Sequence, residues 1–128
     1  MDKNQFIADC MLGKLARWLR ILGFDTQYVR YLSDAQLLAQ ARYQNRILLT
    51  KDTLLHKKAK NLGYLVHSET IDEQVNEIVH HFQLRPNLNL ARCPHCNFPL
   101  KILNQIDFIP WIPLYVLRSF SNIKVCPQ

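Results

Sequence analysis

Residues 6–24 read FIADCMLGKLARWLRILGF and join two hydrophobic patterns within a short distance. Residues 5–10 form a short apolar run that reaches a carboxylate, Asp9, and this predicts a buried strand. Over residues 12–22, the leucines at 12, 15, 19 and 22 recur at helical spacing and share one face. Gly23 is suited to end this helix. The stretch therefore predicts a buried strand followed at once by an amphipathic helix.

The same alternation continues along the chain. Further strands are expected at residues 25–29, 46–50 and 64–67. Further helices are expected at residues 33–44, 53–61 and 71–82. Ser33 and Gln36 form a capping-box pattern at the start of the first of these helices. Strands that alternate with helices are typical of a mostly parallel sheet, so we expect an α/β fold.

Glycine and proline divide the chain into two parts. All three glycines lie before residue 64, and all six prolines lie from Pro86 onward. Regular structure is therefore expected first, and turning or extended chain afterwards. We expect an α/β domain at residues 1–88 and a small C-terminal segment at residues 89–128.

The charge of the chain favours a polyanionic partner. Lys and Arg number 16 against 10 Asp and Glu, and the first 60 residues carry the whole surplus of +6. Such a balance favours nucleic acid first and an anionic membrane surface second. On the first helix, Lys14, Arg17 and Arg20 fall opposite the leucine face and are candidate nucleic-acid contacts. A solvated helix face is the alternative interpretation of this basic stripe.

The N-terminus does not resemble a signal peptide, because Asp9 falls where an uncharged segment would be required. The longest charge-free apolar run, residues 108–117, has ten residues and contains two prolines, whereas a bilayer span needs about 20. A cytoplasmic protein is expected. Cysteines in that compartment are more often metal ligands or reactive thiols than disulfides.

Three carboxylates fall at the carboxyl ends of the expected strands. Asp9 ends the first strand, Asp34 opens the helix after the second, and Asp52 follows the strand at 46–50. Parallel sheets place their ligand crevice at this edge. Two carboxylates about 4 Å apart repel by roughly 4 kcal/mol at an effective dielectric constant of 20, so such a cluster favours a cation. Mg²⁺ or Mn²⁺ suits these oxygen ligands and can activate water at a phosphodiester.

Each acid also has a structural interpretation. Asp34 suits the first turn of a helix, and Asp52 suits the cap of the helix that follows it. Asp9 is different, because an acid at the end of a buried strand needs a partner.

The late cysteines suggest a metal knuckle. Cys93 and Cys96 form a C-x-x-C pair, and Cys126 resembles the start of a second pair in a zinc ribbon that binds Zn²⁺. A fourth cysteine is expected at position 129, beyond Gln128, which leaves an incomplete site, an open site or a truncated chain as alternatives. A thioredoxin-like dithiol is the rival interpretation, but Pro99 disfavours the helix that it requires.

Four segments resemble the Mut-seven C-terminal RNase domain family, which belongs to the PIN-like nuclease superfamily. They are residues 6–26, SDAQLL at 33–38, RILLTKD at 46–52 and CPHCN at 93–97. The resemblance implies a PIN-like α/β fold, metal-dependent RNase activity and a C-terminal zinc ribbon. It assigns acidic site roles to Asp9, Asp34 and Asp52, and phosphate contacts to Lys14, Arg17 and Lys51.

The sequence thus predicts a divalent-metal-dependent ribonuclease. Its main rival is a nucleic-acid-binding protein with the same basic face and ribbon but no turnover. A thiol oxidoreductase that uses Cys93 and Cys96 is the second rival.

Overall fold

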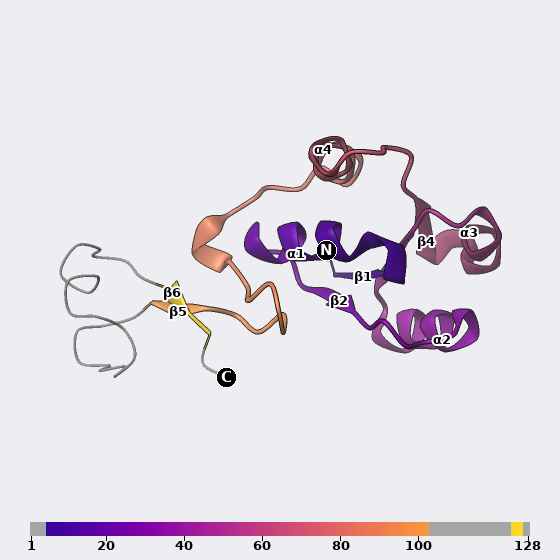
Figure 1. Ribbon diagram of the computed structural model, residues 1–128, viewed down its shortest axis with the longest axis horizontal. Helices are drawn as coiled ribbons and strands as arrows, with labels where there is room; N and C mark the ends of the chain where they lie inside the picture. The colour runs from indigo at the N-terminus through magenta and orange to yellow at the C-terminus, as the bar shows by residue number, and fades with distance from the viewer. Residues whose placement is uncertain (1–4, 103–123, 127–128) are drawn as a thin grey trace.

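The structure is a computed structural model that describes residues 5–102 and 124–126. Four strands and four α-helices build the main body (Figure 1). The strands are β1 (Phe6–Ala8), β2 (Thr26–Tyr28), β3 (Ile47–Thr50) and β4 (Gly63–Leu65). The helices are α1 (Gly13–Ile21), α2 (Asp34–Gln44), α3 (Thr53–Ala59) and α4 (Ile71–His81). Short 3-10 turns lie at Cys10–Leu12, Lys60–Leu62 and Leu88–Leu90, and a small ladder joins β5 (Lys101–Ile102) to β6 (Lys124–Val125).

The four strands form one sheet in the order β2-β1-β3-β4, and every pair is parallel. Phe6 lies opposite Thr26 on one side and Ile47 on the other. The chain runs outward from β1 to β2 and then crosses back to β3, so the strand order reverses between β1 and β3. This reversal is where parallel α/β sheets leave a crevice for a ligand. The expected α/β fold with a parallel sheet is confirmed.

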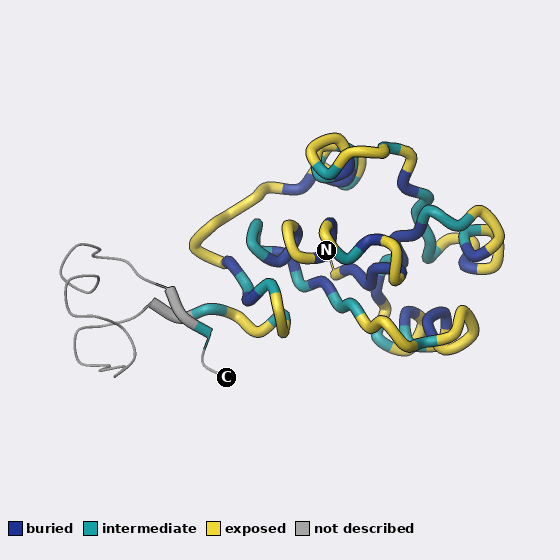
Figure 2. The backbone as a smooth tube through the Cα atoms, viewed as in Figure 1, coloured by how far each residue is buried: buried dark blue, intermediate teal, exposed yellow. Residues whose placement is uncertain are grey.

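Helices cover both faces of the sheet (Figure 1). On one face, Phe6, Ala8 and Leu49 pack with the apolar sides of α1 and α4. On the other face, Ile7 and Leu48 pack with α2 and α3. The two central strands, β1 and β3, are therefore almost entirely buried, whereas the edge strands β2 and β4 are partly exposed (Figure 2). Alternating side chains of the strands pack into two separate hydrophobic cores, one on each face, as is usual for a sheet covered on both sides.

Local signals set the ends of the helices. Ser33 and Gln36 form the expected capping box at the start of α2. Gly23 follows α1 with φ +103°, and an added Cβ there would lie 2.8 Å from the carbonyl oxygen of Asn87. Only glycine suits that position, because both the backbone angle and the close neighbour exclude a side chain.

Strands are shorter than their hydrophobic runs. The first ends at Ala8 because Asp9 begins a 3-10 turn, in which the N–H of Leu12 donates to the carbonyl of Asp9. The last ends at Leu65, before the predicted limit, because the N–H groups of His67 and Ser68 donate to the Glu77 carboxylate. The N–H of Cys10 also donates to the Asp9 side chain, so a side-chain carboxylate accepts backbone hydrogen bonds just past the end of both strands. Within the described ranges, no helix combines the length and the apolar character needed to cross a membrane.

Candidate active site and cysteine knuckle

Asp9 occupies the carboxyl end of β1, at the point where the strand order reverses. Its side chain is only 8% exposed. Oδ1 accepts a 2.6 Å hydrogen bond from the N–H of Cys10, and Oδ2 accepts a 2.9 Å bond from the hydroxyl of Thr50. These two donors stabilise the buried carboxylate.

Asp52 is joined to Asp9 through Thr50. The fully buried Thr50 hydroxyl donates to Asp9 and accepts a 2.9 Å bond from the N–H of Asp52. The Asp52 side chain turns toward α3, where Oδ1 accepts from the N–H groups of Leu54 at 2.9 Å and Leu55 at 3.3 Å. Asp52 is therefore the N-cap of α3, so its structural interpretation is confirmed alongside its place at the site.

Asp34 begins α2 and is exposed. It acts electrostatically on the same edge, where the pKa of the Cys10 thiol is raised by loss of hydration, by Asp9 and, less strongly, by Asp34. The three carboxylates thus flank one edge of the sheet. In the described part of the chain, the three late cysteines are the only group of three or more such residues whose ligand atoms all lie within 4.8 Å of one another.

The donor set at this edge fits a hard divalent cation. Each ionised carboxylate has about four acceptor positions in all, so Asp9 keeps lone pairs after its two hydrogen bonds. Mg²⁺ commonly binds through one or two carboxylates and completes its shell with water and substrate phosphate oxygens. Asp9 and Asp52 can supply those carboxylates, while Asp34 adds negative charge nearby. Their assignment as metal ligands stays a prediction.

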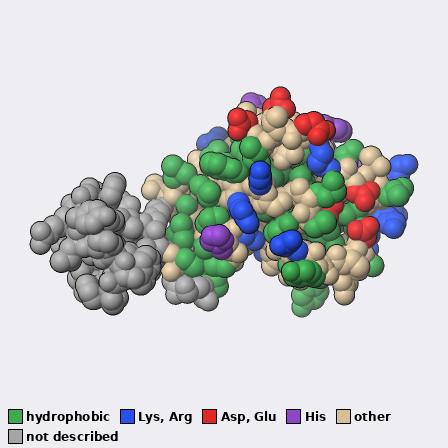
Figure 3. All heavy atoms as spheres, viewed as in Figure 1, with side chains coloured by type: hydrophobic (Ala, Val, Ile, Leu, Met, Phe, Trp, Pro, Cys, Tyr) green, Lys and Arg blue, Asp and Glu red, His purple; other side chains and the backbone are tan. Residues whose placement is uncertain are grey.

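A cleft of about 800 Å³ opens beside this edge. Its walls come from the start of α1, the end of β2 and the segment that leads into α4, and Cys10 places it next to Asp9. Three cations line it, Lys14, Arg17 and Arg30. Figure 3 shows Lys and Arg side chains gathered at the centre of this face, with acidic side chains above them over α4. The cleft therefore suits an anionic ligand.

Two of the expected nucleic-acid contacts are engaged within the protein. Arg20 is 6% exposed, and its guanidinium donates to the carbonyls of Thr26 at 2.8 Å and Pro94 at 2.6 Å. Helical spacing alone groups it with Lys14 and Arg17, but the C-terminal segment covers it. Lys51 donates to the carbonyl of Ser68 at 2.8 Å and pairs with Glu69 at 3.4 Å.

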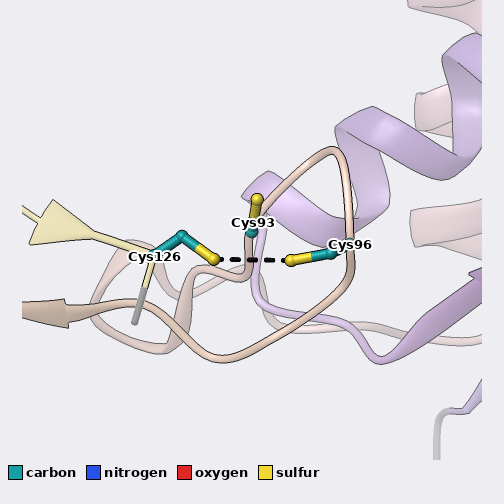
Figure 4. A group of neighbouring side chains, drawn as sticks. All are labelled: Cys93, Cys96 and Cys126. Atoms are coloured by element: carbon teal, nitrogen blue, oxygen red, sulfur yellow. Dashed lines mark hydrogen bonds between the residues drawn. The ribbon is translucent and has the colours of Figure 1, made fainter. Parts of the chain in front are cut away.

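Cys93, Cys96 and Cys126 form a compact group of thiols (Figure 4). Their sulfur atoms all lie within 4.8 Å of one another, and those of Cys96 and Cys126 are 3.4 Å apart. Burial would raise the pKa of Cys93, but hydrogen bonds from the backbone at His95 and Cys96, followed by the other thiols, lower it. Tetrahedral Zn²⁺ with Zn–S bonds of about 2.3 Å suits such a group. These cysteines could hold three corners of a zinc site.

The knuckle, residues 93–97, is fastened to the sheet by polar contacts. On the edge strand β2, the N–H of Thr26 donates to Asn97 Oδ1 at 3.1 Å. Asn97 also donates to Asp25 at 2.6 Å, and Arg46 donates to the same carboxylate at 2.8 Å. Burial would raise the pKa of Asp25, but these two bonds and the nearby arginines lower it overall. The contacts close part of an open sheet edge, which would otherwise leave backbone groups unpaired.

The knuckle geometry disfavours the dithiol interpretation. Residues 94–96 form a turn, and Cys93 does not stand at the start of a helix. Its lowered pKa comes from backbone and thiol hydrogen bonds rather than from a helix dipole.

Three further residues at the site were not identified from the sequence. Thr50 links the Asp9 carboxylate to the backbone N–H of Asp52, and Arg30 and Tyr31 line the cleft. A signal for all three was present, because each lies at or just past the end of a predicted strand. Parallel strands bring such positions to one edge.

The fold and the site define an α/β protein with an acidic edge beside a basic cleft, extended by a cysteine knuckle. A family model described as the Mut7-C RNAse domain matches residues 4–128, so the chain belongs to this family. Its membership indicates a nuclease-type function. Neither the curated proteins nor the solved structures contain a match to this chain.

Proposed function

We propose that this protein hydrolyses phosphodiester bonds of RNA in a divalent-metal-dependent reaction at the β1–β3 edge. The observation that carries the proposal is the hydrogen-bonded series Asp9, Thr50 and Asp52 at the strand-order reversal, next to the basic cleft. Membership in an RNAse domain family supports RNA as the substrate.

In this proposal the carboxylates of Asp9, Asp34 and Asp52 hold Mg²⁺ or Mn²⁺. When bound, the ion lowers the pKa of an attacking water and stabilises the leaving oxygen. Thr50 and the N–H of Cys10 orient Asp9, so that its carboxylate is in place before substrate arrives. Lys14 and Arg17 in the cleft hold the phosphates on either side of the cleaved bond.

We further propose that Cys93, Cys96 and Cys126 hold Zn²⁺ in a structural role. The knuckle contacts Thr26 and Asp25 rather than the acidic edge, so the zinc takes no part in hydrolysis. Its role would be to keep the knuckle compact and docked. The protein is expected to act in the cytoplasm.

The test is cleavage of end-labelled RNA by the zinc-loaded protein, with no other metal, with Mg²⁺ and with Mn²⁺. Asp9→Asn and Asp52→Asn are expected to lower the rate by roughly a hundredfold or more, as when a group that stabilises the transition state is lost. Asp72→Asn is the matched control, because Asp72 is an exposed carboxylate in the first turn of α4. Full activity in both site variants would overturn the assignment.

A second candidate, nucleic-acid binding without turnover, is favoured by one observation. Asp9 and Asp52 both make hydrogen bonds that are sufficient to explain them structurally. If the protein only binds nucleic acid, the wild type would show no metal-dependent cleavage. Asp9→Asn would then bind RNA as well as wild type or more tightly, because a negative charge is removed.

A further inference from the structure

We propose that the substrate of this site is single-stranded RNA, which leaves the acidic edge across α1 and β2 toward the knuckle and stacks an unpaired base on Tyr31. The inference rests on the proposed function and adds to it a substrate class and a path. The contacts that define the path are Arg17, Arg30, Tyr31 and His95.

The path is continuous because two hollows share a wall. The cleft beside Asp9 and a second hollow of about 350 Å³ are both lined by Arg17, Tyr28, Arg30 and Tyr31. The second hollow ends at Pro94 and His95 of the knuckle. A chain that enters at the acidic edge can therefore follow the surface of β2 to the knuckle without leaving a groove.

The charge along this path suits a phosphate backbone. Arg17 and Arg30 line both hollows, while Glu69 is the only acid that lines either. Within the described ranges, neither arginine is engaged in an ion pair or a hydrogen bond. Figure 3 shows the cations at the centre of this face and a histidine near them. Arg17 and Arg30 can therefore each contact one of two successive phosphates of a bound strand.

An exposed aromatic ring points to unpaired bases. Tyr31 is 87% exposed, and it lines both hollows together with Arg17 and Arg30. A base stacked on such a ring buries apolar area, and stacking does not depend on base identity. In a duplex, neighbouring base pairs already cover the faces of each base. The ring therefore favours a single strand.

The groove is held rigid at both ends. Tyr28 donates to the carbonyl of Cys10 at 2.8 Å, and its ring packs against Gly13, where an added Cβ would lie 3.0 Å from the phenol oxygen. At the far end, Arg20 donates to the carbonyl of Pro94 and fastens the knuckle to α1. A groove formed before binding lowers the ordering cost of association.

The test is binding of a fluorescent 12-nucleotide RNA, compared with the duplex of the same sequence, by anisotropy. The full chain is loaded with stoichiometric Zn²⁺ and kept free of Mg²⁺ and Mn²⁺. Tyr31→Ala is expected to weaken single-strand binding about five- to hundredfold, the range for loss of one stacked base, whereas Tyr31→Phe retains it. Tyr43→Ala is the matched control, because Tyr43 is 89% exposed on α2 and lines neither hollow.

The arginines are tested by salt dependence. Arg30→Gln is expected to reduce the slope of log affinity against log salt by about 0.7, the value for one phosphate contact on a single strand. Lys57→Gln on the exposed side of α3 is expected to leave the slope unchanged.

Two results would overturn the inference: duplex bound as tightly as the single strand, or Tyr31→Ala binding like Tyr43→Ala. These measurements require no turnover. Failure of metal-dependent cleavage with Tyr31-dependent binding intact therefore contradicts only the proposed hydrolysis. If the wild-type protein cleaves RNA and Tyr31→Ala changes neither the cleavage rate nor the binding affinity, only the proposed path is contradicted.

Discussion

The hydroxyl group of Thr50 links the Asp9 carboxylate to the backbone of Asp52, two acidic residues that follow neighbouring strands. It donates to Asp9 and accepts from the backbone of Asp52, and it is fully buried. Thr50→Val keeps the shape of the side chain but leaves both partners unsatisfied, at a cost of about 1–3 kcal/mol in the free energy of unfolding. It should also lower kcat more than it raises KM, because Asp9 loses its orientation. Urea unfolding and steady-state kinetics measure the two effects.

Thr50→Ser separates a positioning role from simple packing. Serine restores the hydroxyl and loses one methyl group, so kcat should recover while part of the stability stays lost. A kcat that is equally low in Thr50→Ser and Thr50→Val would contradict the positioning role.

At the scale of elements, Glu77 connects α4 to the chain that leaves β4. Its carboxylate accepts from the Tyr64 hydroxyl at 2.6 Å and from the N–H groups of His67 and Ser68. Burial would raise the pKa of Glu77, but these bonds lower it to about 2. Burial, followed by Glu77 itself, raises the pKa of Tyr64 to about 12. The clamp also holds Ser68, whose carbonyl accepts from Lys51 beside the site.

The pH dependence of this clamp follows from the direction of the two shifts. A lowered carboxyl pKa stabilises the fold fully above about 4.5 and loses its effect as pH falls toward 2. A raised phenol pKa stabilises fully below 10 and loses its effect as pH rises toward 12. Glu77→Gln should therefore destabilise the protein most at intermediate pH, by about 1 kcal/mol.

Denaturant unfolding of wild type and Glu77→Gln from about pH 2 to 11 measures this difference. Glu73→Gln on the same helix is the control, since Glu73 is exposed and should change stability by only a few tenths of a kcal/mol through the helix dipole. A difference between wild type and Glu77→Gln that stays constant from about pH 2 to 5 would argue against the clamp.

At the scale of the whole molecule, Asp25 joins the knuckle to the sheet. Its carboxylate accepts from Arg46, which is 9% exposed, and from Asn97 of the knuckle. Asp25→Asn removes the partner of a buried cation and should cost about 3 kcal/mol in the free energy of unfolding. Backbone amides of the knuckle should also exchange hydrogen faster, because docking is weakened.

The matched control for Asp25→Asn is Glu69→Gln. Glu69 pairs with Lys51 at 3.4 Å but is 84% exposed, so the change should cost less than about 1 kcal/mol. Unfolding in urea and hydrogen exchange measure both variants. Equal stability losses in the two would show that the Asp25 network does not anchor the knuckle.

Much of the fold could be predicted because its signals are local. Each predicted helix and strand of the main body is present, and the capping box at Ser33 and the glycine after α1 act where expected. The carboxyl ends of β1 and β4 lie earlier in the chain than hydrophobic periodicity predicts, because Asp9 and Glu77 accept hydrogen bonds from the backbone N–H groups that follow each strand. Those contacts link residues whose pairing is invisible to hydrophobic periodicity.

The candidate site was also partly predictable from local patterns and partly decided by tertiary contacts. Alternating patterns place Asp9, Asp34 and Asp52 at one edge, because parallel strands all end on the same side of a sheet. Helical spacing likewise groups Lys14, Arg17 and Arg20. The structure separates Arg20 from that group, since the knuckle packs over it and takes up its hydrogen bonds.

The sequence by itself determined the α/β class, the family and the strand-end acids, because these depend on short-range periodicity and local motifs. Only the tertiary structure decided that Thr50 bridges Asp9 and Asp52, that Arg20 anchors the knuckle, and that Arg30 and Tyr31 form one groove. The physical reason is distance along the chain: Thr50 lies 41 residues from Asp9, and Pro94 lies 74 residues from Arg20. Such contacts exist only once the sheet has brought its strands side by side and the C-terminal segment has docked.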